Sequence, residues 1–145
     1  MPHTLARNLV HCVFSTKGRF PLIREPEQLW RHLGVIARVK NIALLSAGGT
    51  ANHVHILLAL SPTMALANAV QNLKAHSSRW MKEEVRKFAW QKGYGAFGVS
   101  ESQRSTVLEY IGRQAEHHQK WTYEQEYRTL VRKARLEFDE RFLFG

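Results

Sequence analysis

Cysteine and long apolar runs are scarce in this sequence. The single cysteine, Cys12, excludes an intramolecular disulfide and favours a cytoplasmic protein. No apolar run approaches the ~20 residues that span a bilayer, and the first residues lack the apolar core of a secretory signal, so we expect no membrane partner. Cys12 lies within the apolar run Leu9–Phe14, which predicts a small buried side chain rather than a nucleophile.

Acidic residues are also in short supply. The chain has 12 Asp and Glu residues against 21 Lys and Arg residues, a net charge of +9. With 44% hydrophobic and 23% charged residues the composition is that of an ordinary globular protein, so the positive charge belongs to a folded body. Such an excess attracts polyanions, and nucleic acid is the leading class of partner. A length of 145 residues predicts a single domain over residues 1–145.

The apolar pattern predicts an α+β fold in which helices pack on an antiparallel sheet. The strand-like runs are Leu9–Ser15, Ile42–Gly48 and Asn52–Leu60. A short loop containing Gly49 and Thr50 separates the last two runs, which indicates a β-hairpin. The glycines of segment 93–99 are expected to weaken a strand and permit a hinge. The apolar tail Phe138–Phe144 is expected to dock on the body of the protein.

Four helices are predicted. One begins near Pro26 and reaches about residue 40, and another keeps helical spacing from Leu66 to Phe88 over roughly six turns. The other two are predicted to open at capping boxes and to run through His117 and over about Tyr123–Arg135. The residues of these two capping boxes are Ser100 with Gln103 and Thr122 with Gln125.

Two histidines stand at the start of the apolar run N-H-V-H-I-L-L-A-L, which covers Asn52–Leu60. Side chains of a strand alternate between its faces, so His53 and His55 project from one side. Two imidazoles can share one metal ion, with a third ligand from elsewhere in the chain. A pair of strand histidines with polar partners and no metal is the more frequent outcome for this motif alone.

A tyrosine and a glutamine lie one helical turn apart in L-E-Y-I-G-R-Q. Tyr110 and Gln114 therefore share a helix face and could approach the same ion and phosphate. Glu109 points about 100° away from Tyr110, which predicts a carboxylate that faces solvent. His117 and His118 could assist as a ligand or an acid, although an exposed or packed histidine is more common.

Together these motifs resemble the HUH single-tyrosine transposases of small bacterial insertion sequences and their domesticated relatives associated with palindromic repeats. The resemblance is carried by N-H-V-H-I-L-L and E-Y-I-G-R-Q, and extends to H-C-V-F-S-T-K-G-R-F-P, N-L-K-A-H-S-S-R-W and Y-G-A-F-G-V-S. It implies a ferredoxin-like domain similar to RNA-recognition domains. It also implies a homodimer whose tyrosine helix can serve the histidine pair of the partner.

The resemblance implies roles for four residues. His53, His55 and Gln114 would bind Mg²⁺ or Mn²⁺, and Tyr110 would be the nucleophile that cleaves single-stranded DNA at hairpin-marked ends. Imidazole ligands suit Mn²⁺ better than the harder Mg²⁺. The sequence has no G-x-x-x-x-G-K-[ST] loop, so no nucleotide cofactor is expected.

Several cations are candidates for contacts with DNA. Three of them, Lys74, Lys82 and Arg86, form with Ser78 a stripe of residues spaced four apart along one predicted helix, which indicates either a solvated face or a track for phosphates. Arg79 and the net charge favour the track. Lys17 and Arg19, after the first strand, could grip a phosphate or simply form a surface turn.

Two alternatives remain open at this point. Tyr123 and Tyr127 are also four residues apart, as in two-tyrosine nucleases, but their helix is expected to place Gln125 and Glu126 on other faces, so we expect packing aromatics. A non-cleaving module could instead bind hairpin DNA or RNA by stacking aromatics on unpaired bases. Its candidate aromatics, each equally credible as a core residue, are Trp80, Trp90, Tyr94 and Phe97.

Overall fold

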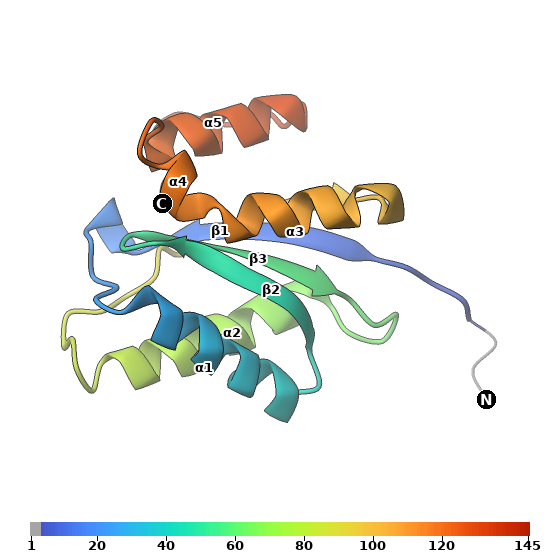
Figure 1. The fold of residues 1–145 in the computed structure, drawn as a ribbon, viewed down its shortest axis with the longest axis horizontal. Coiled ribbons are helices and arrows are strands. Elements are labelled where there is room, and N and C mark those ends of the chain that lie inside the picture. Colours follow the sequence, from blue (N-terminus) through green and yellow to red (C-terminus); the bar gives the residue numbers. More distant parts are fainter. Residues whose placement is uncertain (1–3) are drawn as a thin grey trace.

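A computed structural model describes residues 4–145 and contains a four-stranded antiparallel sheet in the order β2-β3-β1-β4. The strands are β1 (Leu9–Ser15), β2 (Ala43–Thr50), β3 (His53–Ala59) and β4 (Gly95–Val99). Helices cover both faces of this sheet, so the predicted α+β class is confirmed (Figure 1).

The helices divide between the two faces of the sheet (Figure 1). On one face lie α1 (Pro26–Val39) and α2 (Leu66–Met81). On the other lie α3 (Arg104–Gly112), α4 (Gln114–His117) and α5 (Tyr123–Lys133). Two short 3₁₀ helices are η1 (Lys17–Arg19) and η2 (Glu101–Gln103). The sheet is therefore the middle layer of three.

All seven residues of β1 are buried because both faces of this central strand are covered. One set of alternating side chains, which includes Cys12 and Phe14, packs in the core beneath α1 and α2. The opposite set includes His11 and Val13 and faces α3 to α5. Cys12 is the buried side chain that was predicted, and burial raises the pKa of its thiol to about 12, which makes it a poor nucleophile.

The predicted hairpin is confirmed, but its boundary differs from the expectation. Strand β2 continues through Thr50, and the turn consists of Ala51 and Asn52. Gly49 and Thr50 therefore pair with β3 instead of forming the loop. Thr50 lies opposite His53, and its hydroxyl lies 3.0 Å from Nδ1 of that imidazole. This tight turn fixes the register that places the histidine pair.

The helix expected to run from Leu66 to Phe88 ends at Met81. Val85 and Phe88 are buried, but they reach the core from turns rather than from a continued helix. After these turns the chain returns to the sheet, where Trp90 packs edge-to-face on Phe14 of β1, with ring centroids 4.9 Å apart. The expected cationic stripe is thus interrupted, since Lys82 caps the helix and Arg86 lies outside it.

The C-terminal half corrects two further expectations. Ser100 forms no helix cap, and the residues after it make the 3₁₀ helix η2 before α3 begins at Arg104. The helix expected to continue through His117 is interrupted at Arg113, where α3 gives way to α4. The capping box of Thr122 with Gln125 is confirmed and opens α5.

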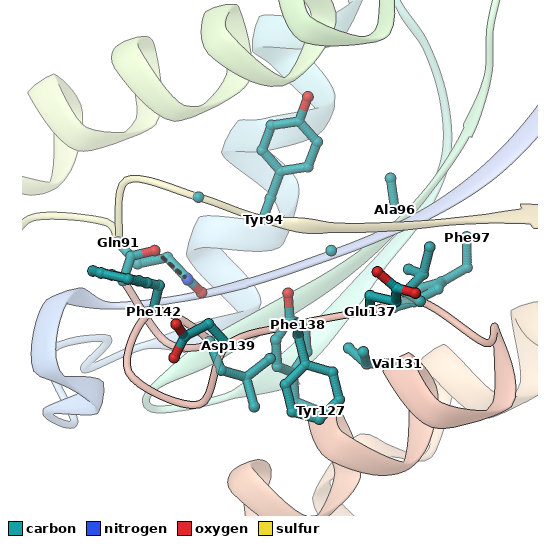
Figure 2. Close-up of a pocket in the computed structure, with 15 residues that line it drawn as sticks. Gln91, Tyr94, Ala96, Phe97, Tyr127, Val131, Glu137, Phe138, Asp139 and Phe142 are labelled. Atoms are coloured by element: carbon teal, nitrogen blue, oxygen red, sulfur yellow. Dashed lines mark hydrogen bonds between the residues drawn. The ribbon is translucent and has the colours of Figure 1, made fainter.

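The glycine-rich segment expected to act as a hinge is strand β4, which pairs with β1. The apolar tail docks against it, as predicted, and Figure 2 shows tail residues facing β4 across a pocket of about 320 Å³. Leu143 is buried against Val13 and Tyr127, whereas Phe142 is 71% exposed. The carbonyl oxygen of Gly145 accepts a hydrogen bond from Nε2 of Gln91 at 3.0 Å.

Helix α3 approaches the sheet closely at Gly48. A Cβ atom at this position would lie 2.3 Å from the backbone oxygen of Ile111, a residue that packs with Leu9 and Leu57 under α3. Only a residue without a side chain allows this contact, so Gly48 sets the height of α3 above the histidine-bearing face.

Gly48→Ala is expected to destabilise the protein by roughly 1–3 kcal/mol, because the added carbon collides with helix backbone that cannot move alone. Gly98→Ala in β4 is the matched control, since nothing lies within 4 Å of its added Cβ. Urea unfolding of both variants measures the difference. Equal stability of the two variants would contradict this account of α3 docking.

Candidate active site

The two histidines of β3 lie side by side under the C-terminal helices. His53 and His55 are both 0% exposed and share the sheet face that was predicted. Nδ1 of His53 lies 2.8 Å from Oδ1 of Asn52. When Nδ1 donates its hydrogen to Asn52, Nε2 presents a lone pair towards α4, as in a metal-binding histidine.

Gln114 joins the histidine pair from the first residue of α4. Its side-chain oxygen lies 3.0 Å from Nε2 of His53 and 3.0 Å from Nε2 of His118. The break between α3 and α4 at Arg113 leaves Gln114 only 1% exposed. The structure therefore brings together three of the residues singled out in the sequence: His53, His55 and Gln114.

The centre of the cluster is a residue that the sequence analysis did not select. Glu126 of α5 is 2% exposed, and its Oε1 accepts hydrogen bonds from Nε2 of His55 and of His118, both at 2.9 Å. Its Oε2 accepts one from Nε2 of Gln114 at 3.0 Å and one from the hydroxyl of Tyr110. The expectation that Glu126 lies on another face of its helix than Tyr123 and Tyr127 is wrong, because all three side chains are buried.

The pattern of α5 explains where Glu126 lies. Tyr123, Tyr127 and Val131 are buried and recur at helical spacing, and Glu126 falls on the same face. A carboxylate within an apolar stripe is a signal for a buried polar site, and this signal could have identified Glu126 from the sequence. Both tyrosines pack in the core as expected, and Tyr123 stacks on His53 with ring centroids 4.5 Å apart.

A third strand histidine extends the cluster. His11 of β1 is 5% exposed, and its Nε2 lies 2.8 Å from Nδ1 of His55. Its position two residues before Val13 places it on the same strand face, a periodicity signal that is present in the sequence. His118, expected to be exposed or packed, is half-buried and bonded to Glu126.

The electrostatic state of the cluster suits metal binding. Burial is the main cause that lowers the pKa of His11 and of His53 to about 3, so both imidazoles are neutral near pH 7. Burial alone would raise the pKa of the Glu126 carboxyl, but hydrogen bonds from His118 and His55 outweigh it and hold that pKa well below its ordinary value. Neutral imidazole and ionised carboxylate are the forms that bind metal ions.

Tyr110 stands at the edge of this cluster. Its ring centroid lies 5.6 Å from that of His55, and its hydroxyl donates to Glu126. Burial, followed by the hydrogen bond to Glu126, raises the pKa of the phenol above its ordinary value, so Tyr110 is protonated near pH 7. Two cavities meet at its side chain, one of about 740 Å³ and one of about 230 Å³. The tyrosine is thus accessible from solvent while it touches the buried carboxylate.

The donor set fits a divalent transition-metal ion. One ligand atom from each of four residues lies within 4.8 Å of the others, and these residues are His53, His55, His118 and Glu126. Nitrogen ligands with one carboxylate suit Mn²⁺ or Zn²⁺ better than Mg²⁺, whose usual partners are oxygens.

The six cations predicted to contact DNA lie apart from Tyr110 or have other partners. Lys74 donates to the backbone oxygens of residues 91, 92 and 93, at 2.6, 3.1 and 3.1 Å. Arg19 pairs with Glu124 at 3.4 Å. The exposed members of the set are Lys17, Arg79, Lys82 and Arg86, of which Arg79 lies on α2, across the sheet from Tyr110. Their contacts with DNA stay a prediction.

Glu109 is exposed, as expected, and pairs with Arg113.

Comparison with known proteins identifies the family. The model of the family described as "Transposase IS200 like" matches residues 5–114. The chain therefore belongs to the IS200-like transposase family, as its resemblance predicted. The comparison with curated proteins gave no match.

Two solved structures share the fold. A crystal structure of a candidate transposase from Deinococcus radiodurans R1 has 23% identity and a TM-score of 0.64, and the match covers 79% of this chain and 95% of that one. The structure of a REP-associated tyrosine transposase bound to a REP hairpin has 12% identity and a TM-score of 0.61, with 84% and 76% covered. Within residues 4–145, no helix combines the length and apolar character that a bilayer crossing requires.

Acid should destabilise the protein through its buried histidines. Between about pH 6.5 and 3 the unfolded chain protonates His11 and His53 while the folded chain keeps them neutral, so stability falls as pH falls. Each histidine contributes at most about 1.4 kcal/mol per pH unit in that window. The free energy of unfolding, measured with urea at pH 7, 6 and 5, should change less with pH for His11→Gln than for the unchanged protein. His76→Gln, outside the site, is the control, and equal slopes for all three proteins would refute the assignment.

Proposed function

We propose that this transposase cleaves and rejoins single-stranded DNA at hairpin-marked ends, with a bound divalent metal ion and a covalent 5′-phosphotyrosine at Tyr110. The observation that carries the proposal is the contact of one phenol with a buried group of imidazoles and a carboxylate. The homodimer and the identity of the metal, Mg²⁺ or Mn²⁺, are parts of this proposal.

The chemistry explains why these groups belong together. A phosphodiester resists attack because its anionic oxygens repel the nucleophile, and a bound cation offsets that repulsion. A tyrosine with a raised pKa is a poor nucleophile until a nearby positive charge favours its phenolate. Residues His53 and His55, with Gln114, would hold such a cation beside Tyr110.

The role of the chain is to hold the phenol and the scissile phosphate in line. When the oxygen of Tyr110 attacks phosphorus, a P–O bond to tyrosine forms, the bond to the 3′ oxygen breaks, and a free 3′-OH leaves. The phosphotyrosine retains the energy of the broken bond, so a 3′-OH from another strand can reverse the reaction without ATP. This agrees with the expectation that no nucleotide cofactor is needed.

The surroundings of Tyr110 suit a DNA strand. The larger cavity beside it is lined by Arg113 and Lys120, which can pair with phosphates, and by Trp121, which is 48% exposed and can stack on a base. Lys133 lines the smaller cavity. These residues supplement the six cations predicted from the sequence. The hairpin bound by the REP-associated relative supports hairpin DNA as the partner.

The non-cleaving alternative has less support. Trp90, one of its stacking candidates, is 8% exposed and packs between Phe14 and Phe88 in the core. Trp80 already stacks on His32, with ring centroids 4.2 Å apart. A binding module also has no need for a buried carboxylate surrounded by imidazoles.

Tyr110→Phe is expected to abolish the covalent adduct with a labelled single strand that carries a hairpin, because no oxygen remains to attack phosphorus. Tyr127→Phe, at a buried tyrosine of α5, is the control and should still form the adduct. Denaturing electrophoresis with Mn²⁺ present measures both. An adduct that persists in Tyr110→Phe would refute the choice of nucleophile.

The position of Tyr110 beside Glu126 and His55 of its own chain supports catalysis within one subunit. A mixture of His53→Ala and Tyr110→Phe proteins should then remain inactive, because neither chain carries a complete site. Restored cleavage would show instead that tyrosine and histidines come from different chains, as the dimer of the resembled family implies. A mixture of either variant with unchanged protein is the positive control.

A further inference from the structure

Glu126 and His118 lie beyond the part of the chain that matches the family model, which ends at residue 114. Yet both contribute to the same cluster as His53 and His55. The family match therefore accounts for the histidine pair and for Gln114, but not for the carboxylate at the centre of the site.

We propose that Glu126 and His118 are ligands of the same divalent ion as His53 and His55, and that the Glu126 carboxylate also positions the hydroxyl of Tyr110. The inference rests on the proposed function for the presence of the ion. It deepens that function, because it makes α5 part of the metal site and makes the nucleophile respond to the ion.

The two oxygens of Glu126 face different groups. Oε1 lies 2.9 Å from Nε2 of His55, 2.9 Å from Nε2 of His118 and 3.5 Å from Nε2 of His53. Oε2 instead accepts the hydroxyl of Tyr110 and the amide of Gln114. Oε1 thus lies among the possible metal ligands, whereas Oε2 contacts the proposed nucleophile.

Charge supports the same assignment. Ion-pair partners of Glu126 among the described residues are all histidines, namely His53, His55, His117 and His118. A buried carboxylate is costly unless cationic partners or a metal ion compensate for it. A divalent cation held among these imidazoles would compensate the carboxylate directly.

The position of Glu126 is fixed by the rest of α5. The capping box at Thr122 sets where the helix begins, and Tyr123 and Tyr127 on either side of Glu126 pack beneath it. A ligand held in this way is pre-organised, because its rotamer is restricted before any ion binds.

Mn²⁺ binding measured by calorimetry tests the assignment. Glu126→Gln and His118→Gln should each weaken Mn²⁺ affinity by at least ~10-fold, since even outer partners of ligands have effects of that size. Glu124→Gln is the matched control, because Glu124 lies on the same helix and pairs with Arg19 at the surface. Affinity that is unchanged in Glu126→Gln and His118→Gln would overturn the proposal.

Mn²⁺ binding by His53→Ala separates this inference from the proposed function. If His53→Ala loses Mn²⁺ while Glu126→Gln and His118→Gln bind normally, the metal-dependent function stands and the new ligands are wrong. If His53→Ala also binds normally, the metal site of the proposed function fails as well. Circular dichroism of each variant verifies that it folds.

The unchanged protein provides a further test, in which Tyr110→Phe serves only to assign one signal. With tyrosines labelled by ¹³C at the ζ carbon, the signal of Tyr110 is identified by its loss in Tyr110→Phe. Addition of Mg²⁺ should shift this signal, because the ion withdraws electron density from the carboxylate that accepts the phenol. A signal that stays fixed at saturating Mg²⁺ would overturn the link between the ion and the nucleophile.

Discussion

A single buried carboxylate holds the functional half of this protein together. Glu126 accepts hydrogen bonds from β3 through His55, from α3 through Tyr110 and from α4 through Gln114, while it belongs to α5 itself. One strand and three consecutive helices therefore converge on two oxygen atoms. The sheet provides the rigid floor for this arrangement, because β1 and β3 are covered on both faces and cannot shift without exposing the core.

This arrangement sets the chemical state of the groups at the centre of the site. Burial, by lowering its pKa, keeps His53 neutral, and hydrogen bonds, by lowering the pKa of Glu126, keep that carboxylate ionised. Tyr110 remains protonated because burial and the hydrogen bond to the neighbouring carboxylate raise its pKa. In the proposed function, Tyr110 would stay in position but unreactive until a bound cation favours its phenolate.

Local sequence signals predicted much of the fold and part of the site. The alternation of β3 placed His53 and His55 on one face, and the capping box at Thr122 placed the start of α5, because both depend on neighbouring residues alone. The end of α2 was not predictable, since Val85 and Phe88 keep helical spacing although tertiary packing brings them in from turns. The role of Glu126 was not predicted, because its hydrogen-bond partners lie on three other elements that only the fold brings together.

The most direct test of the central claim is an anomalous-scattering map from crystals grown with Mn²⁺. Our account predicts a single strong peak between the imidazoles of His53 and His55, beside Glu126 and within reach of the oxygen of Tyr110. The absence of a peak at this cluster, with Mn²⁺ bound elsewhere or not at all, would contradict it.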